Sequence, residues 1–210
     1  MLTLISVAAA LSPLPPGLNE FSRTSGRAGS LFSIRRSVAG AIGRALSDGV
    51  ELLEVEFPPL LETKTQFDDY SNVEVLDANR DFAVQLALEP ELCSTAPEGS
   101  LWLCFADDGE AELAREAWPG KIFAAATSTS IAAAVSASGV EPLKPFGAWA
   151  TRGKAEAAAA AAAVAPAAML HVAVQPGDGG PIEDWLNLEL LKRNDTPLVC
   201  LNGALDKVAR

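Results

Sequence analysis

The sequence predicts an α/β protein of the doubly wound class, with a mostly parallel sheet of about five strands and helices on both faces. Short apolar runs of four to six residues alternate along the chain with segments of helical periodicity. These runs are continuously apolar, as expected for strands that helices cover on both faces. The chain has 210 residues, 49% of them hydrophobic and 20% charged, which is ordinary for one globular core.

In the first half of the chain, glycine and proline separate the predicted elements. Gly49 follows the first segment of helical spacing, and Pro58-Pro59 ends the first apolar run. Pro90 and Pro119-Gly120 close the next two helices, because proline lacks a backbone donor and restricts the residue before it. The elements predicted here are a helix over Ser33–Asp48, a strand over Leu52–Phe57, a helix over Asp77–Leu88, a strand over Leu101–Phe105 and a helix over Glu110–Trp118.

In the second half, the predictions rest on apolar runs and on alanine. Ile122–Ala126 is predicted as the third strand, and Ser128 or Thr129 as the cap of a helix that reaches Ser138. Lys154–Val164 is nearly all alanine, the best helix former, and is predicted to be helical. The remaining elements are a strand over Met169–Val174, a helix over Ile182–Arg193 and a strand over Leu198–Leu201.

Charge is distributed unevenly along the chain. The net charge is −11, yet residues 1–47 hold five arginines and a single glutamate. An acid-poor start with arginine and serine is typical of an organelle transit segment. We therefore expect residues 1–30 to be a disordered targeting segment and residues 31–210 to form a single α/β domain. The acidic remainder disfavours binding to nucleic acid.

Membrane insertion is not expected. The longest apolar run near the start, Leu2–Leu11, is too short to span a bilayer. It is either the apolar core of a secretory signal placed ahead of a transit peptide, or a weakly apolar part of the transit peptide itself.

Polar residues that follow the predicted strands form a candidate site, because open α/β sheets bind ligands beyond the carboxyl ends of their strands. Four aspartates in this set could bind Mg²⁺ together, or they could simply cap the following helices. The loop around Gly179 could cradle a phosphate or serve as a tight turn. Asp107, Asp108, Asp178, Gly179 and Asn202 are the candidate ligand-binding residues; Thr127, Ser128, Gln175 and Asp206 share these loops.

No catalytic residue, metal site or cofactor is predicted. The single histidine, His171, lies in a predicted strand, where a hydrogen-bonded core position is expected. There is no G-x-S-x-G motif and no Walker lysine. Cys104 and Cys200 fall in apolar runs and are expected to be buried and reduced. Phe146 and Trp149, in a loop rich in proline and glycine, are candidate partner-binding residues.

Two stretches of the sequence resemble a known family. They are LLEVEFPP at residues 52–59 and PLVCLNGALDKV at residues 197–208, with the segments 101–107 and 111–118 fitting between them in order and spacing. Over residues 33–210 the chain is similar to a plastid and cyanobacterial family catalogued as domain of unknown function 1995. The resemblance implies a stromal, partly thylakoid-associated protein that assists photosystem II assembly, notably of the CP43 subunit. It supplies no catalytic residues, and it implies further α/β structure after the N-G-x-L-D turn that is absent here.

Three hypotheses for function follow. The first is a non-enzymatic assembly factor that binds a photosystem II assembly protein or a photosystem subunit, peripheral to the thylakoid. The second is an enzyme or sensor that binds a nucleotide or phosphorylated ligand with the strand-end carboxylates. The third is a peripheral subunit of a photosynthetic complex.

Overall fold

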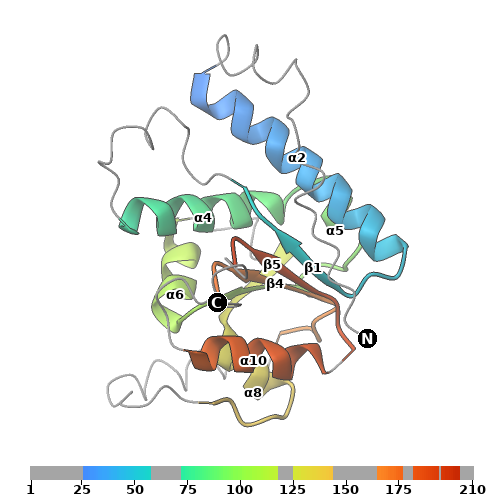
Figure 1. Cartoon of the computed structure of the whole chain (residues 1–210), viewed down its shortest axis with the longest axis vertical. Helices are drawn as coiled ribbons and strands as arrows, with labels where there is room; N and C mark the ends of the chain where they lie inside the picture. Colours follow the sequence, from blue (N-terminus) through green and yellow to red (C-terminus); the bar gives the residue numbers. More distant parts are fainter. Residues whose placement is uncertain are drawn as a thin grey trace.

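The computed structural model describes residues 26–57, 72–117, 125–143, 165–176, 182–193 and 195–203. Its elements are α2 (Gly26–Ser47), β1 (Leu52–Val55), α4 (Asn72–Leu86), α5 (Pro90–Cys93), β2 (Leu101–Phe105), α6 (Asp108–Ala117), β3 (Ala126–Ser130), α8 (Ile131–Ala137), β4 (Leu170–Val174), α10 (Ile182–Lys192) and β5 (Leu198–Leu201). The five strands form one sheet in the order β1-β5-β4-β2-β3, and every pair of neighbours is parallel (Figure 1). The predicted doubly wound α/β fold is confirmed.

The strand order reverses between β2 and β4. From β2 the chain moves outward to β3 at one edge, and from β4 it moves the other way to β5. The carboxyl ends of β2 and β4 therefore flank the topological switch point, which is where sheets of this class bind ligands.

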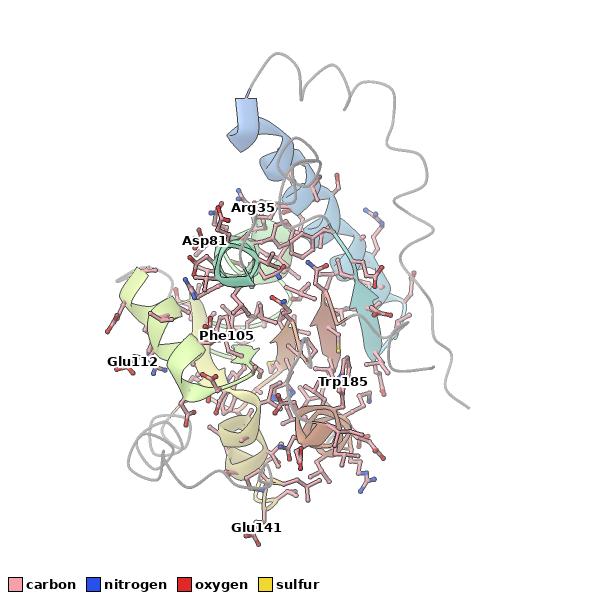
Figure 2. All side chains as sticks on the ribbon, turned by 60° about the vertical axis from the view of Figure 1, so that its left-hand side comes forward. Arg35, Asp81, Phe105, Glu112, Glu141 and Trp185 are labelled. Carbon is pink, nitrogen blue, oxygen red and sulfur yellow. The ribbon has the colours of Figure 1, made fainter. Side chains whose placement is uncertain are left out.

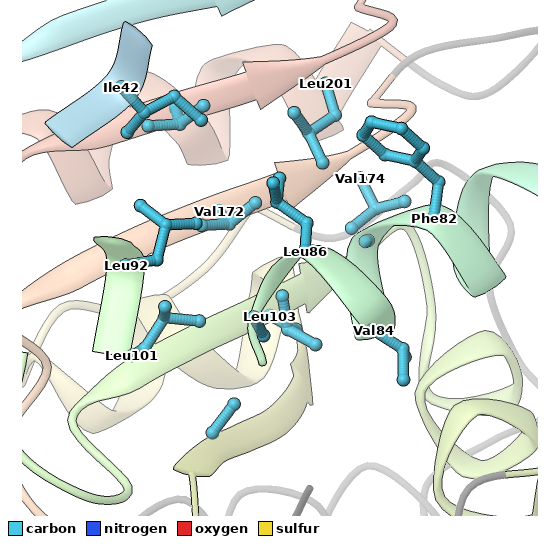
Figure 3. Close-up of a cluster of buried hydrophobic side chains, with 14 of the residues drawn as sticks. Ile42, Phe82, Val84, Leu86, Leu92, Leu101, Leu103, Val172, Val174 and Leu201 are labelled. Carbon is cyan, nitrogen blue, oxygen red and sulfur yellow. The ribbon is translucent and has the colours of Figure 1, made fainter. Parts of the chain in front are cut away.

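Alternate residues of each strand face two separate helical layers. Leu101, Leu103 and Phe105 of β2 join the core formed with α2, α4, α5 and α6 (Figure 3). Trp102 and Cys104 face the opposite way, into the core formed with α8 and α10. Figure 2 shows side chains filling the space between the sheet and its helices on both sides. Each fully buried leucine stabilises the fold by about 1.5–3 kcal/mol relative to an exposed one.

Helix α2 is anchored by apolar and ionic contacts. The core between α2 and the sheet contains the buried side chains of Val38, Ala39 and Ile42. Nε of Arg35 donates to Oε1 of Glu89 at 2.5 Å, and the same guanidinium donates to Gln85 at the end of α4. These contacts join α2 to the segment between α4 and α5.

The third strand is displaced from its predicted position. It spans Ala126–Ser130 rather than Ile122–Ala126, so Thr127 and Ser128 lie within the strand and do not follow it. The helix cap is Ser130, whose Oγ accepts from the Ala133 N–H at 3.2 Å, and not Ser128 or Thr129. Two hydroxyls of this polar strand find backbone partners: Thr127 donates to the Gly99 carbonyl and Ser128 to the Ala111 carbonyl. The buried Thr129 hydroxyl has no partner among the described residues.

Helix α4 begins at Asn72, five residues before its predicted start, and the short helix α5 was not predicted. The alanine-rich segment Lys154–Val164 lies outside the described residues. Within the described part of the chain, no helix combines the length and apolarity that crossing a membrane requires.

Candidate functional site at the carboxyl ends of the strands

Three of the five candidate ligand-binding residues fall in the described part of the chain, and all three lie at the carboxyl edge of the sheet. Asp107 and Asp108 follow β2, and Asn202 follows β5. Gln175 joins them at the end of β4. Asp178, Gly179, Asp206, Phe146 and Trp149 lie outside the described residues.

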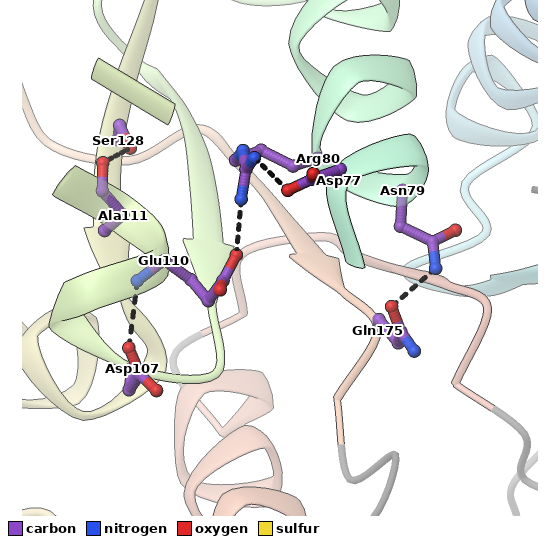
Figure 4. A network of polar contacts seen from close by, with 8 residues as sticks. All are labelled: Asp77, Asn79, Arg80, Asp107, Glu110, Ala111, Ser128 and Gln175. Atoms are coloured by element: carbon purple, nitrogen blue, oxygen red, sulfur yellow. Dashed lines mark hydrogen bonds and ion pairs between the residues drawn. The ribbon is translucent and has the colours of Figure 1, made fainter. Parts of the chain in front are cut away.

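A chain of side-chain amides connects the ends of three strands to α4. Nδ2 of Asn79 donates to Oε1 of Gln175 at 2.5 Å (Figure 4). Nδ2 of Asn202 donates to Oδ1 of Asn79 at 2.7 Å, and the Phe57 N–H donates to Oδ1 of Asn202 at 2.8 Å. We call Asn79, Gln175 and Asn202 the amide network. It ties β1, β4 and β5 to one helix at the candidate site.

Gln175 and Asn202 both have left-handed backbone conformations, with φ of 46° and 49°. Asparagine tolerates this region, whereas glutamine adopts it at a cost of roughly 1–2 kcal/mol. Each residue still extends the sheet, since the Gln175 N–H donates to the Leu201 carbonyl and the Asn202 N–H to the Val55 carbonyl, both at 2.8 Å. The amide network therefore holds two adjacent strand ends in an unusual turn.

Arg80 connects α4 to α6 beside the amide network. Its Nη1 donates to Oε2 of Glu110 at 2.9 Å, and its Nη2 pairs with Asp77 (Figure 4). The residue is only 8% exposed, and its Nε–H has no partner in the described part of the chain. Two carboxylates thus neutralise Arg80, the one buried Lys or Arg side chain among the described residues.

Asp107 caps helix α6. Its Oδ1 accepts from the Glu110 N–H at 2.9 Å, which is the capping geometry that satisfies a free amide of the first turn. A side chain at Gly109 would meet this carboxylate, since an added Cβ would lie 3.0 Å from Oδ1. Oδ1 of Asp108 is buried, with no hydrogen-bond partner among the described residues. For Asp107, the capping alternative is confirmed.

A further carboxyl group, Asp184, lies in the first turn of α10 and was not predicted. It is 8% exposed, and its pKa is raised to about 6, first by burial and then by the charges of Asp107 and Glu183. A carboxyl group with this pKa exchanges a proton near neutral pH. Within the described ranges, no group of three or more His, Cys, Asp or Glu residues is placed to hold a metal ion.

His171 and the two strand cysteines lie within strands and not at the carboxyl edge where the polar groups of the site gather. His171 is 4% exposed, and the Trp102 ring meets its ring edge-on at a centroid distance of 6.0 Å. The expected burial is confirmed, but Nδ1 makes no hydrogen bond to the described residues. Burial lowers the pKa of His171 to about 4.

Cys104 and Cys200 are buried, as predicted. Burial raises the pKa of both thiols, that of Cys200 to about 12.

Asn79 and Asp184 were missed because both lie inside helices rather than in loops after strands. Asn79 carried a usable signal, because it interrupts the apolar stripe that Leu76 and Ala83 define at helical spacing on α4. A polar residue in such a stripe needs buried partners. Asp184 offered no comparable signal, since acids are common in the first turn of any helix.

The fold and the polar strand ends define a doubly wound α/β protein with its candidate site at the switch point. The family described as "Domain of unknown function (DUF1995)" matches residues 30–210, and the chain belongs to this family. No curated protein and no solved structure matches the chain significantly.

Proposed function

We propose that this chain is a non-enzymatic plastid protein that assists the assembly or accumulation of photosystem II. It would act in the stroma or at the thylakoid surface by binding an assembly protein or the CP43 subunit. The family membership supports this proposal, as does the resemblance to the plastid member called low photosystem II accumulation three. Residues 1–30 would then be a targeting segment, and mass spectrometry of the native protein would find a start after them.

The non-enzymatic part of the proposal depends on how the polar groups at the carboxyl edge of the sheet are bonded. The polar groups at the carboxyl edge bind mainly one another. The members of the amide network bind one another and the Phe57 N–H, Asp107 caps α6, and Arg80 is held between two carboxylates. Side chains spent on internal hydrogen bonds stabilise the strand ends and are not free to contact a substrate.

The test is complementation by a triple variant in which Asp107, Asp108 and Asp178 become asparagine. Asparagine caps helices about as well as aspartate, so we expect little loss of stability at each position and normal photosystem II accumulation. Thermal melting of the purified variant provides the control for folding. A variant that melts normally but restores no photosystem II would overturn the proposal.

A second candidate function is binding of a nucleotide or phosphorylated ligand at the same edge. The left-handed Gln175 favours it, because strained backbone concentrates at functional sites, and so does the raised pKa of Asp184 at the switch point. Thermal melting with a panel of nucleotides and sugar phosphates tests it. A ligand at 100 times its Kd would stabilise the protein by about 2.7 kcal/mol, an easily measured shift in Tm.

A third candidate, a peripheral subunit of a photosynthetic complex, differs from the first in stoichiometry. An assembly factor would co-purify with incomplete photosystem II and be missing from the mature complex. Equimolar recovery with the mature complex would favour the subunit instead.

A further inference from the structure

Helix α10 exposes apolar side chains on its outer surface. Ile182 is 66% exposed and Leu186 is 41% exposed, and the two lie one turn apart on the same side of the helix. The inner side of the same helix is used for packing, with Leu188 and Leu191 buried against α8 and the sheet. Leu143, which follows α8, adds a third exposed apolar side chain at 43%. We call Leu143, Ile182 and Leu186 the α10 apolar surface.

A buried asparagine fixes Leu143 beside α10. The Leu143 N–H donates to Oδ1 of Asn187 at 2.8 Å, and Nδ2 of Asn187 donates to the Leu143 carbonyl at 2.9 Å. Asn187 is only 1% exposed, and this part-buried pair of hydrogen bonds holds the Leu143 backbone against the helix. The backbone of Leu143 is thus fixed beside α10 before any partner arrives, which lowers the entropy that binding must overcome.

Two glutamates are close in sequence to the residues of the α10 apolar surface. Glu183 lies between Ile182 and Leu186 in the helix, and Glu141 is exposed two residues before Leu143. Figure 2 shows Glu141 at the outer end of the molecule, beyond α8 and α10. The basic residues at the end of α10 add no free positive charge, because Lys192 pairs with Glu51 at 2.9 Å and Arg193 with Glu189 at 2.7 Å.

We propose that the α10 apolar surface binds a basic amphipathic segment of another protein. Its apolar side would cover Leu143, Ile182 and Leu186, and its lysines or arginines would face Glu141 and Glu183. A second copy of this chain fits poorly, because it would bring the same glutamates together on a protein of net charge −11. A membrane carrying anionic lipids would be repelled for the same reason. The surface is small, so the contact suits a transient partner.

This inference names the chemistry of the partner and rests on the proposed function only for the partner's identity. The probe is a labelled peptide of about 18 residues made of leucine and lysine in helical amphipathic order, with a glutamate-for-lysine version as control. We expect fluorescence anisotropy to show binding of the lysine peptide alone. Replacing Ile182 and Leu186 by serine should weaken that binding by about tenfold.

Matched variants separate a specific surface from general stickiness. Leu113→Ser changes a leucine of α6 that is 44% exposed, in a helix also rich in glutamate, and should leave binding unchanged. Glu141→Lys with Glu183→Lys keeps the apolar side chains and should weaken binding, whereas Glu116→Lys should not. If the control variants Leu113→Ser and Glu116→Lys weakened peptide binding as much as the variants of the α10 apolar surface and its glutamates, the inference would be overturned. The inference would also fail if the wild type self-associated in gel filtration, or bound anionic vesicles, and the serine variant no longer did so.

Complementation distinguishes failure of this inference from failure of the proposed function. If the serine and lysine variants fold normally and restore photosystem II as well as the wild type, the surface is not the partner site and the proposed function stands. If the surface binds the peptide specifically but loss of the whole protein leaves photosystem II unchanged, the proposed function fails and the surface is retained.

Discussion

Asp107 and Asp184 approach the same edge of the sheet from helices on opposite faces, and the negative charge of Asp107 adds to the burial that raises the pKa of Asp184. Asp107 is fixed there by capping α6, and Asp184 by its place in the first turn of α10. The starts of the two helices that follow β2 and β4 thus bring two acidic side chains into electrostatic interaction at the switch point of the fold. The raised pKa of Asp184 is therefore a measurable property of this edge.

Asp184→Asn should stabilise the folded protein at neutral pH. The folded chain retains a proton on Asp184 up to about pH 6, while the unfolded carboxyl group loses it near its ordinary pKa of 3.8. The free energy of unfolding therefore falls as the pH rises through that window, by up to about 3 kcal/mol. Relative to the wild type, the variant should therefore gain stability progressively between pH 4 and pH 7 in denaturant titrations, whereas Glu141→Gln, at an exposed site, should show no such pH-dependent difference.

His171 should contribute a slope of opposite sign. Burial lowers its pKa from 6.5 to about 4, so the unfolded chain binds a proton in this window and the folded chain does not. Stability from this residue is complete above pH 6.5 and is lost as the pH falls towards 4, by about 3 kcal/mol. His171→Phe should abolish that loss. Because the two groups oppose each other, the wild type should show a flatter profile than either variant, and a steep profile in all three proteins would contradict both assignments.

Replacement of Asp107 separates its capping from its charge. Asp107→Asn keeps an acceptor for the Glu110 N–H and should change the free energy of unfolding little, whereas Asp107→Ala should destabilise the protein by about 0.5–2 kcal/mol. Both variants remove the negative charge and should lower the pKa of Asp184, which NMR titration of the Asp184 carboxyl carbon can follow. An unchanged pKa in both variants would show that Asp107 does not contribute to the raised value.

The left-handed backbone of Gln175, in the amide network, allows its strain to be measured. Gln175→Ala loses the hydrogen bond from Asn79 and keeps a side chain at a φ of 46°, whereas Gln175→Gly loses the same bond but relieves the strain. The alanine variant should therefore be less stable than the glycine variant by roughly 1 kcal/mol, a reversal of the usual preference. Chemical denaturation of both variants, with Asn79→Ala as a reference for the hydrogen bond alone, measures the difference.

Cys104 and Cys200 should resist both alkylation and mutual oxidation in the folded protein. Their thiols are buried with raised pKa values, so little thiolate forms at neutral pH. They lie on β2 and β5 with Ala173 of β4 between them, which separates the two Cα atoms by roughly 10 Å, more than a disulfide spans. Cys93 is exposed and should react first with a thiol reagent. Rapid labelling of all three under native conditions would contradict the burial.

The sequence predicted the fold wherever a strand consists of apolar residues. Leu101–Phe105 is apolar throughout, and β2 has those bounds. β3 was misplaced because its residues after Ala126 are all threonine and serine. Its pairing with β2 and the carbonyls of Gly99 and Ala111, which bind Thr127 and Ser128, come from segments distant in sequence. The residues of the strand itself do not reveal partners that lie so far away in the sequence.

The same limit applies to the candidate site. Asp107 and Asn202 could be named from their places after strands, because the rule about carboxyl ends depends only on strand order along the chain. Asn79 and Asp184 reach that edge from helices, and their roles depend on how those helices are turned against the sheet.

The position of β5 has a consequence for how the chain acquires its structure. Among the described strands, β1 lies at the edge of the sheet and pairs only with β5. The Phe57 N–H that binds Asn202 lies 145 residues before it. On the ribosome, Leu52–Val55 must wait without a neighbouring strand until Leu198–Leu201 has been synthesised and inserts between β1 and β4. Pairing over so long a stretch of chain is slow, and until it happens two unpaired strand edges are open to aggregation, so the nascent protein should depend on a chaperone more than a helical protein of equal length does.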